Sequence, residues 1–488
     1  MRVSFRRRGG AAGLAITLAI ALALAVMAGA WEARPAIAQD GKDTPPAGGE
    51  PRDYRIPETR SFALPNGMQV TLAPYGWLPK VTVQLAVRAG NVNEAADQVW
   101  LADLTGDLMM EGTTSRTGRE LAIDAAGIGG EVDVSVGPDE TTIGGDALSE
   151  FAPELIRLVA DVARNPSFPT SELERLKADR IRQVTIARSQ PQQLTLEKFR
   201  ALMYPDHPYG RIFPSPEMLE GYTLEDVSAF YEANIGAARS HLFVSGQFDG
   251  AAVEAAVREA FGDWEAGPAP VTDAPEPVSE RVIHLVDRPG AVQSTVYIGL
   301  PVPDPSSPDW VPLQVTNALL GGSFSSRITS NIRETKGYTY SPFSAVSTRY
   351  RDAYWVEAAD VTTDVTGASL KEIFYEIDRL QAEPPGEEEL TGIQNYLAGT
   401  FVLQNSSPSG IINQLRFLEL HGLDRSYLTD FVQHVFEVTP VDVQRVARDY
   451  LEDERMLIVI AGDEAVITEQ VRPYGDIAGG ESPPLERE

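Results

Sequence analysis

The chain repeats itself at a constant offset of about 216 residues, and this repeat restricts its possible folds more than any other feature. Each copy contains an acidic helix start, a Thr-x-x-Asp-Val segment, an Arg and an apolar strand pattern. The matched segments are 172–191 with 389–408, 223–227 with 439–443, and 239–246 with 455–462. We interpret the repeat as the duplication of one domain of about 200 residues, and two such copies often enclose a cleft. The alternative is that acidic helix starts resemble one another by chance.

Short strand patterns alternate with longer helical patterns in the first copy. Asn-Gly at 66–67 lies between apolar runs and predicts a hairpin turn. A strand is predicted at 81–87, helices near 99–110 and 119–126, and a further strand at 131–136. This alternation indicates an α+β or α/β domain.

Composition divides the chain into segments. Three Arg at 6–8 precede an apolar run at 11–28 and the small residues Ala36-Ile37-Ala38, a pattern typical of a cleaved secretory signal peptide. A membrane anchor is the alternative, because about 18 apolar residues approach the length that spans a bilayer. The predicted segments are a signal peptide at 1–38, a flexible leader at 39–58, a first domain at 59–265, a proline-rich linker at 266–280, a second domain at 281–470 and a tail at 471–488.

Composition also excludes several classes of function. The chain has no Cys, which excludes a thiol nucleophile, a cysteine zinc site and a disulfide framework. Its 41 Lys and Arg against 70 Asp and Glu give a net charge of −29, which disfavours nucleic acid and anionic membranes as partners. No phosphate-binding loop is present, so we expect no cofactor in this chain. An exported, cysteine-free and acidic protein fits a bacterial periplasm.

Residues 101–113, Leu-Ala-Asp-Leu-Thr-Gly-Asp-Leu-Met-Met-Glu-Gly-Thr, resemble the active-site helix of the insulinase (pitrilysin) family of zinc metallopeptidases. The resemblance includes Leu-Pro-Asn-Gly at 64–67, His-Pro-Tyr-Gly at 207–210 and Gly-Gly-Ser-Phe-Ser-Ser-Arg at 321–327. It covers nearly all of the chain after the predicted signal peptide. The length is similar to that of the short members that work as pairs of chains, such as the mitochondrial processing peptidase. The resemblance implies two homologous α/β-roll domains that face each other in a clamshell.

The resemblance also locates a zinc site that this chain has lost. Catalytic members carry H-x-x-E-H, in which two His bind zinc, the Glu activates water, and a distant Glu is the third ligand. The corresponding positions here are Asp103, Gly106, Asp107 and Gln183. We therefore expect no metal in this chain. The alternative is a weak site for a hard cation at Asp103 and Asp107.

The second copy keeps the other functional element of the family. Arg333 and Tyr340 have the seven-residue spacing of the Arg and Tyr that active members place over the zinc site, where they hold the substrate and stabilise the oxyanion. The residues predict a helix at 325–334 closed by Gly337, with Tyr340 on the next strand. The alternative is an Arg favoured by the helix dipole and a Tyr that packs a sheet edge. The adjacent residues expected to bind substrate are Gly321, Gly322, Ser323 and Phe324.

Together these features predict a non-catalytic, substrate-binding subunit of a heterodimeric periplasmic zinc endopeptidase. Arg333 and Tyr340 would complete the zinc site of a sister chain that has an intact H-x-x-E-H, and zinc is expected in that partner. Peptide substrates would extend the sheet at strand 131–136. The alternatives are a peptidase-like structural or peptide-binding scaffold without proteolytic role, and a metallopeptidase with an unorthodox site. A homodimer of this chain also stays open.

Overall fold

The computed structural model describes residues 55–478 of the chain. The described residues belong to one compact unit, so both copies of the repeat belong to the same body. The predicted signal peptide at 1–38, most of the predicted leader and the last residues of the predicted tail lie outside the described residues.

Two six-stranded sheets form the framework, and five strands of each share one topology. The strand order is β1-β2-β6-β3-β5-β4 in the first sheet and β12-β7-β11-β8-β10-β9 in the second. The strands are β1 (Arg60–Ala63), β2 (Gln69–Pro74), β3 (Lys80–Val87), β4 (Glu131–Val136), β5 (Thr141–Leu148), β6 (Ser240–Gly246), β7 (Val282–Asp287), β8 (Gln293–Val302), β9 (Phe343–Arg349), β10 (Asp352–Thr362), β11 (Leu457–Gly462) and β12 (Asp476–Ile477). In both sheets one inner pair, β2 with β6 and β7 with β11, is parallel, and β3 and β8 then pair antiparallel with β6 and β11. The outer strands differ, because β1 is antiparallel to β2 whereas β12 is parallel to β7. This correspondence confirms the predicted duplication of an α/β domain.

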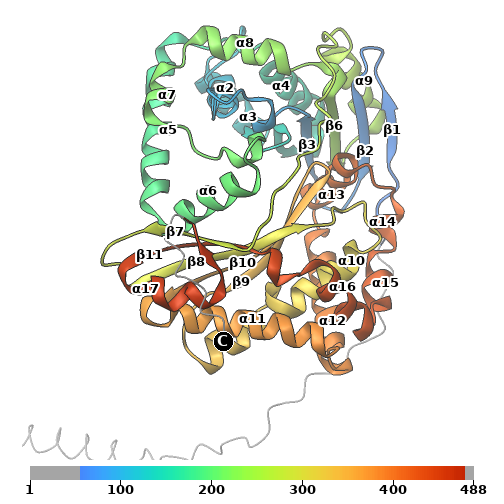
Figure 1. Ribbon diagram of the computed structural model, residues 1–488. Helices are drawn as coiled ribbons and strands as arrows, with labels where there is room; N and C mark the ends of the chain where they lie inside the picture. The colour runs from blue at the N-terminus through green and yellow to red at the C-terminus, as the bar shows by residue number, and fades with distance from the viewer. Residues whose placement is uncertain (1–54, 479–488) are drawn as a thin grey trace, which may run out of the picture. The chain divides into compact units, whose positions relative to one another are not determined.

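Helices accompany each sheet in chain order (Figure 1). Those of the first copy are α2 (Leu101–Met110), α3 (Gly118–Gly127), α4 (Ala152–Arg164), α5 (Thr170–Ser189), α6 (Pro191–Met203), α7 (Pro216–Gly221), α8 (Leu224–Asn234) and α9 (Gly250–Phe261). Those of the second copy are α10 (Trp310–Asn317), α11 (Thr366–Ala382), α12 (Glu387–Gln404), α13 (Pro408–His421), α14 (Ser426–Thr429), α15 (Phe431–Glu437), α16 (Pro440–Tyr450) and α17 (Glu464–Val471). Two π-helical segments, η5 (Ala318–Gly322) and η6 (Thr329–Thr335), follow α10.

Identical caps explain why the repeated Thr-x-x-Asp segments begin a helix. The Thr223 hydroxyl accepts from the Asp226 amide at 3.2 Å, and the Asp226 carboxylate accepts from the Thr223 amide at 2.9 Å. Thr439 and Asp442 form the same reciprocal pair at 3.2 and 3.0 Å. Such a capping box satisfies two amides that have no partner within the helix. The sequence therefore specifies the starts of α8 and α16 locally.

The two copies exchange one helix each. Phe199 and Met203 of α6, from the first copy, pack against Tyr354 and Val459 of the second sheet (Figure 1). Conversely, α13 of the second copy packs Ile411, Ile412 and Leu415 on the first sheet, against Ala73, Ala86 and Phe243. The hydroxyl of Tyr204, directly after α6, donates to the buried Asp352 carboxylate of β10. This reciprocal burial makes the two copies one interlocked unit.

The two ends of the described chain both contact the second copy. Ile56, within the predicted leader, packs against the second hydrophobic core, and the Pro57 carbonyl accepts from Arg425 at 3.1 Å. At the other end, β12 lies within the predicted tail and pairs with β7. Among the described residues, no helix is long and apolar enough to cross a membrane.

Candidate functional site

Helix α2 carries the positions where the family has its zinc ligands. Asp103 and Asp107 are one turn apart and share a face, whereas Leu101, Leu104 and Leu108 of α2 are buried. Glu94 caps the start of α2, because its Oε1 accepts from the Ala102 amide at 2.9 Å. Burial raises the pKa of Glu94 to about 8. This hydrogen bond fixes the position of the start of α2, and with it the positions of Asp103 and Asp107.

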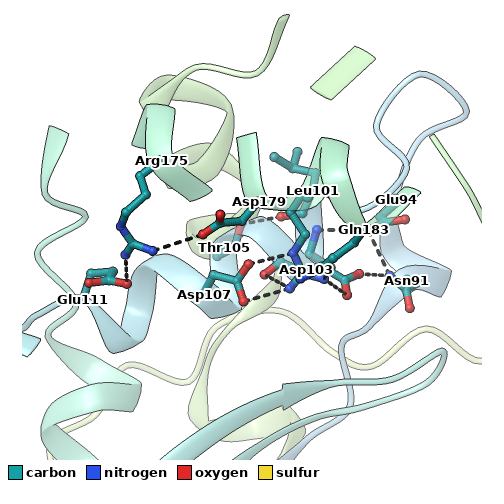
Figure 2. A network of polar contacts seen from close by, with 12 residues as sticks. Asn91, Glu94, Leu101, Asp103, Thr105, Asp107, Glu111, Arg175, Asp179 and Gln183 are labelled. Atoms are coloured by element: carbon teal, nitrogen blue, oxygen red, sulfur yellow. Dashed lines mark hydrogen bonds and ion pairs between the residues drawn. The ribbon is translucent and has the colours of Figure 1, made fainter. Parts of the chain in front are cut away.

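Asp103 and Asp107, labelled in Figure 2, both accept hydrogen bonds from Arg180 of α5. Its Nε and Nη2 donate to the two carboxylate oxygens of Asp107 at 2.7 and 2.8 Å, and its Nη1 donates to Asp103 Oδ1 at 3.1 Å. Asn91 donates to the other Asp103 oxygen at 2.7 Å. The guanidinium also lies 5.6 Å from the Trp100 ring centroid. The pair of hydrogen bonds from Arg180 to Asp107 is bidentate, the strongest arrangement of an Arg with a carboxylate.

The pKa values of this cluster follow from burial and charge. Burial raises the pKa of Asp103, and the charge of Arg180 and the Asn91 hydrogen bond oppose that rise. Burial lowers the pKa of Arg180, but its hydrogen bonds and the charges of both aspartates outweigh this and raise it. The cluster is a mutually dependent, largely buried set of charges.

The other two predicted positions lie in the same place. Gln183 is one helical turn after Arg180, and its Oε1 accepts from Arg180 Nη1 at 3.4 Å. A Cβ atom at Gly106 would lie 2.9 Å from Val136 Cγ2 and 3.2 Å from Val134 Cγ1, so α2 packs closely on β4 at this glycine. The structure thus brings all four degenerate positions together. Arg180, one turn before Gln183, was absent from the sequence-based site, because no local pattern distinguishes it from the exposed Arg182 on the same helix.

These residues do not fit a zinc ion. All four carboxylate oxygens of Asp103 and Asp107 already accept hydrogen bonds from Arg180 or Asn91. Gly106 supplies no group that could activate water. Over residues 55–478, no group of three His, Cys, Asp or Glu could hold a metal ion. The Arg180 guanidinium therefore supplies the positive charge between α2 and α5. The carboxylate oxygens of Asp103 and Asp107 that would bind a weakly held cation are already engaged by hydrogen bonds.

Arg333 and Tyr340 do lie together, although the local structure differs from the prediction. The Arg333 guanidinium is 4.8 Å from the Tyr340 ring centroid and 4.4 Å from that of Phe324, so it lies against both rings. Its Nε also pairs with Glu334 at 3.1 Å. Phe324 is 70% exposed and Tyr340 is 78% exposed. The two rings are therefore at the surface, and the Arg333 side chain that contacts both is 22% exposed.

A helix is present in the segment predicted at 325–334, and most of it is the π-helix η6. The prediction for Tyr340 was wrong, because this residue precedes β9 instead of lying on a strand. Gly337 does close the helix as predicted, with φ +68° and its amide donating to the Arg333 carbonyl at 3.1 Å. Helix propensity does not predict the i→i+5 hydrogen bonds of a π-helix, because packing against the rest of the fold decides whether they form.

The four residues expected to bind substrate differ in accessibility. Gly321 and Ser323 are buried, Gly322 is half-buried and Phe324 is exposed. A Cβ at Gly321 would lie 2.6 Å from Glu357 Oε2. Glu357 is fully buried, and this burial raises its pKa well above the usual range. Of the four, Phe324 is the residue that offers a side chain to a ligand.

Comparisons with known proteins agree with this geometry. Residues 78–217 match the family described as "Insulinase (Peptidase family M16)", and residues 221–397 match "Peptidase M16 inactive domain". An uncharacterized zinc protease of Mycobacterium tuberculosis is 26% identical over 85% of this chain and 96% of its own length. A probable mitochondrial-processing peptidase subunit beta of Arabidopsis thaliana is 24% identical over 83% of this chain and 78% of its length.

Solved structures show the same fold. A peptidase M16 inactive domain from Pseudomonas fluorescens superimposes with a TM-score of 0.77 at 22% identity, covering 83% of this chain and 98% of that one. A protease from Helicobacter pylori has a TM-score of 0.78 at 20% identity, covering 84% and 100% of the two chains. The two-copy architecture is therefore shared with both proteins.

Proposed function

Because the chain belongs to the insulinase (M16) family and has a peptidase-like fold without a zinc-binding group among its described residues, we propose that it is a non-catalytic, peptide-binding subunit of a zinc endopeptidase. In this proposal it works in the periplasm, pairs with a sister chain that has an intact H-x-x-E-H, and contributes Arg333 and Tyr340 to that chain's zinc site.

One contrast between the two copies carries the proposal. In the first copy, Arg180 neutralises both aspartates and holds the former metal position closed. In the second copy, the partly exposed Arg333 lies between two exposed aromatic rings and pairs with one carboxylate, that of Glu334. Because the rings contact the face of the guanidinium, the N–H groups other than the Nε–H beside Glu334 can donate to a peptide carbonyl or to an oxyanion. The chain has thus lost the residues for activating water and kept those for stabilising charge.

The names of relatives support a paired subunit of a zinc protease. One relative is named as the beta subunit of a mitochondrial-processing peptidase, and several are named as zinc proteases. Zinc would accordingly belong to the sister chain. The second candidate is a scaffold without a proteolytic role, which the contact of Arg333 with Glu334 favours, because that pairing partly satisfies the guanidinium within the chain.

The test is peptidase activity on a quenched peptide, with zinc content measured in parallel. The purified chain alone should be inactive and hold no stoichiometric zinc, and co-expression with a sister chain bearing H-x-x-E-H should restore activity. In that mixture Arg333→Ala should lower kcat about 10²–10³-fold, the usual cost of losing one oxyanion donor. Tyr340→Phe should lower it by removing the phenol.

Matched substitutions separate the two candidates. Arg472→Ala and Tyr375→Phe change an Arg and a partly exposed Tyr elsewhere in the second copy, and both should leave the mixture fully active. A mixture whose activity survives Arg333→Ala unchanged would establish the scaffold instead. Chelator-sensitive activity of the chain alone would refute both.

A further inference from the structure

A polar hollow of about 600 Å³ lies between η6, α11 and the start of α12 in the second copy. Its lining combines hydroxyls, charged side chains and one aromatic ring. η6 contributes the hydroxyls of Ser330 and Thr335, and the ring of Tyr375 on α11 is 53% exposed. A hollow of this size can hold a small organic ligand.

Each cation of this lining is paired with a carboxylate of the same lining. The three pairs are Arg327 with Glu389 at 2.7 Å, Lys336 with Glu372 at 3.1 Å, and Arg379 with Glu376 at 3.3 Å. The hydrogen bonds from Arg327 lower the pKa of Glu389, so this pair stays ionised at neutral pH. The charges of the lining therefore cancel, and a charged ligand would compete with one of these pairs.

Two polar atoms of the lining lack a hydrogen-bond partner among the described residues. The Arg327 side chain is 8% exposed, and its Nη1 donates to no acceptor. Asn331 Oδ1 accepts from no donor, although Asn331 Nδ2 donates to Glu372 at 3.0 Å and to Glu376 at 2.8 Å. Buried polar atoms normally have a partner, so one missing acceptor and one missing donor point to groups that do both, such as hydroxyls.

We propose that this hollow binds a neutral sugar. Each hydroxyl of a sugar ring both donates and accepts, so one can accept from Arg327 and another can donate to Asn331. The apolar C–H face of the ring can pack on Tyr375, a rigid aromatic side chain that provides contact area at a low cost in conformational entropy. Because the charges of the lining cancel, a neutral sugar should bind better than the same sugar with an added carboxylate or ammonium group.

Saturation-transfer NMR on the full purified chain tests the inference without a sister chain. The probes are glucose, galactose and mannose, each compared with its own uronate and its own 2-amino derivative. At least one neutral sugar should bind with a dissociation constant of about a millimolar, the strength expected for a ligand of this size. Its two charged derivatives should bind about tenfold more weakly. Arg327→Lys keeps a charge beside Glu389 but removes the unpaired N–H, and Tyr375→Ala removes the ring; each should weaken binding about tenfold.

Two substitutions outside the hollow are the matched controls. Arg472→Lys changes an Arg that pairs with Glu469, and Tyr396→Ala removes a ring on α12 that is 47% exposed; neither should change sugar binding. The inference is overturned if no neutral sugar binds, which would mean that water alone occupies the hollow, or if the charged derivatives bind equally well. Equal weakening by the controls and by the two substitutions in the hollow would also overturn it. Because Tyr375 is exposed, its variant tests the site even if Arg327→Lys does not fold. Arg333 does not line the hollow, so sugar binding and the activity measured in the mixture can fail independently.

Discussion

Arg180→Ala tests the idea that a guanidinium has taken over the place of a metal ion. The Arg180 side chain is 15% exposed, Asp103 is 17% exposed and Asp107 is 32% exposed. Removing one partner of a buried ion pair costs about 3–5 kcal/mol, because the remaining charge is left uncompensated. Since water can reach Asp107, we expect the lower end, a loss of about 3 kcal/mol in the free energy of unfolding at pH 7.

The loss should depend on pH with a definite sign. Burial already raises the pKa of Asp103, and removing Arg180 removes the charge that opposes this rise. An acid whose pKa is higher in the folded state stabilises the fold when protonated, and this contribution is lost as the pH rises through the folded pKa. The difference in the free energy of unfolding between the wild type and Arg180→Ala should therefore be larger at pH 8 than at pH 5.

Urea unfolding followed by circular dichroism measures the effect. Arg182→Ala is the matched control, because Arg182 is on the same helix, is 66% exposed and pairs with Asp179; it should cost less than about 0.5 kcal/mol. Replacing Arg180 with Met and both Asp103 and Asp107 with Leu should recover stability to within about 1 kcal/mol of the wild type. If Arg180→Ala costs no more than Arg182→Ala, the guanidinium does not hold α2 and α5 together.

Three further outcomes follow from single contacts. The folded wild type keeps a proton on Glu94 up to about pH 8, whereas the unfolded chain loses it near pH 4.5, so the wild type loses stability between these values. The free energy of unfolding of Glu94→Gln, measured by urea unfolding, should therefore rise relative to that of the wild type by roughly 2–5 kcal/mol from pH 4.5 to pH 8. Gly321→Ala should lower the thermal midpoint, because its Cβ would meet two buried oxygens within 2.6 Å, whereas Gly127→Ala at the end of α3 meets nothing within 4 Å and should raise it. Tyr204→Phe should cost about 1–3 kcal/mol by leaving the buried Asp352 without its donor, and a smaller loss in chemical denaturation would contradict the interlock between the copies.

The sequence by itself determined the features that depend on short-range chemistry. Thr223 with Asp226, and Thr439 with Asp442, begin the same helix in each copy because a capping box needs residues only three positions apart. The Asn-Gly turn at 66–67 and strand 131–136 were likewise predictable, since Gly67 has φ +95° and the apolar alternation of β4 has the period of a strand. The loss of the zinc ligands could also be read directly, because it concerns residue types at a known spacing.

The tertiary structure decided what depends on contacts between distant elements. Arg180 meets Asp103 across 77 positions of sequence, and no local pattern distinguishes it from the exposed Arg182 on the same helix. The π-helical form of η6 and the position of Tyr340 outside a strand were decided in the same way, by packing. The exchange of α6 and α13 between the two copies also has no local signal, because an amphipathic helix buries its apolar face equally well against either of two similar sheets. Which sheet it covers is settled by the whole set of contacts.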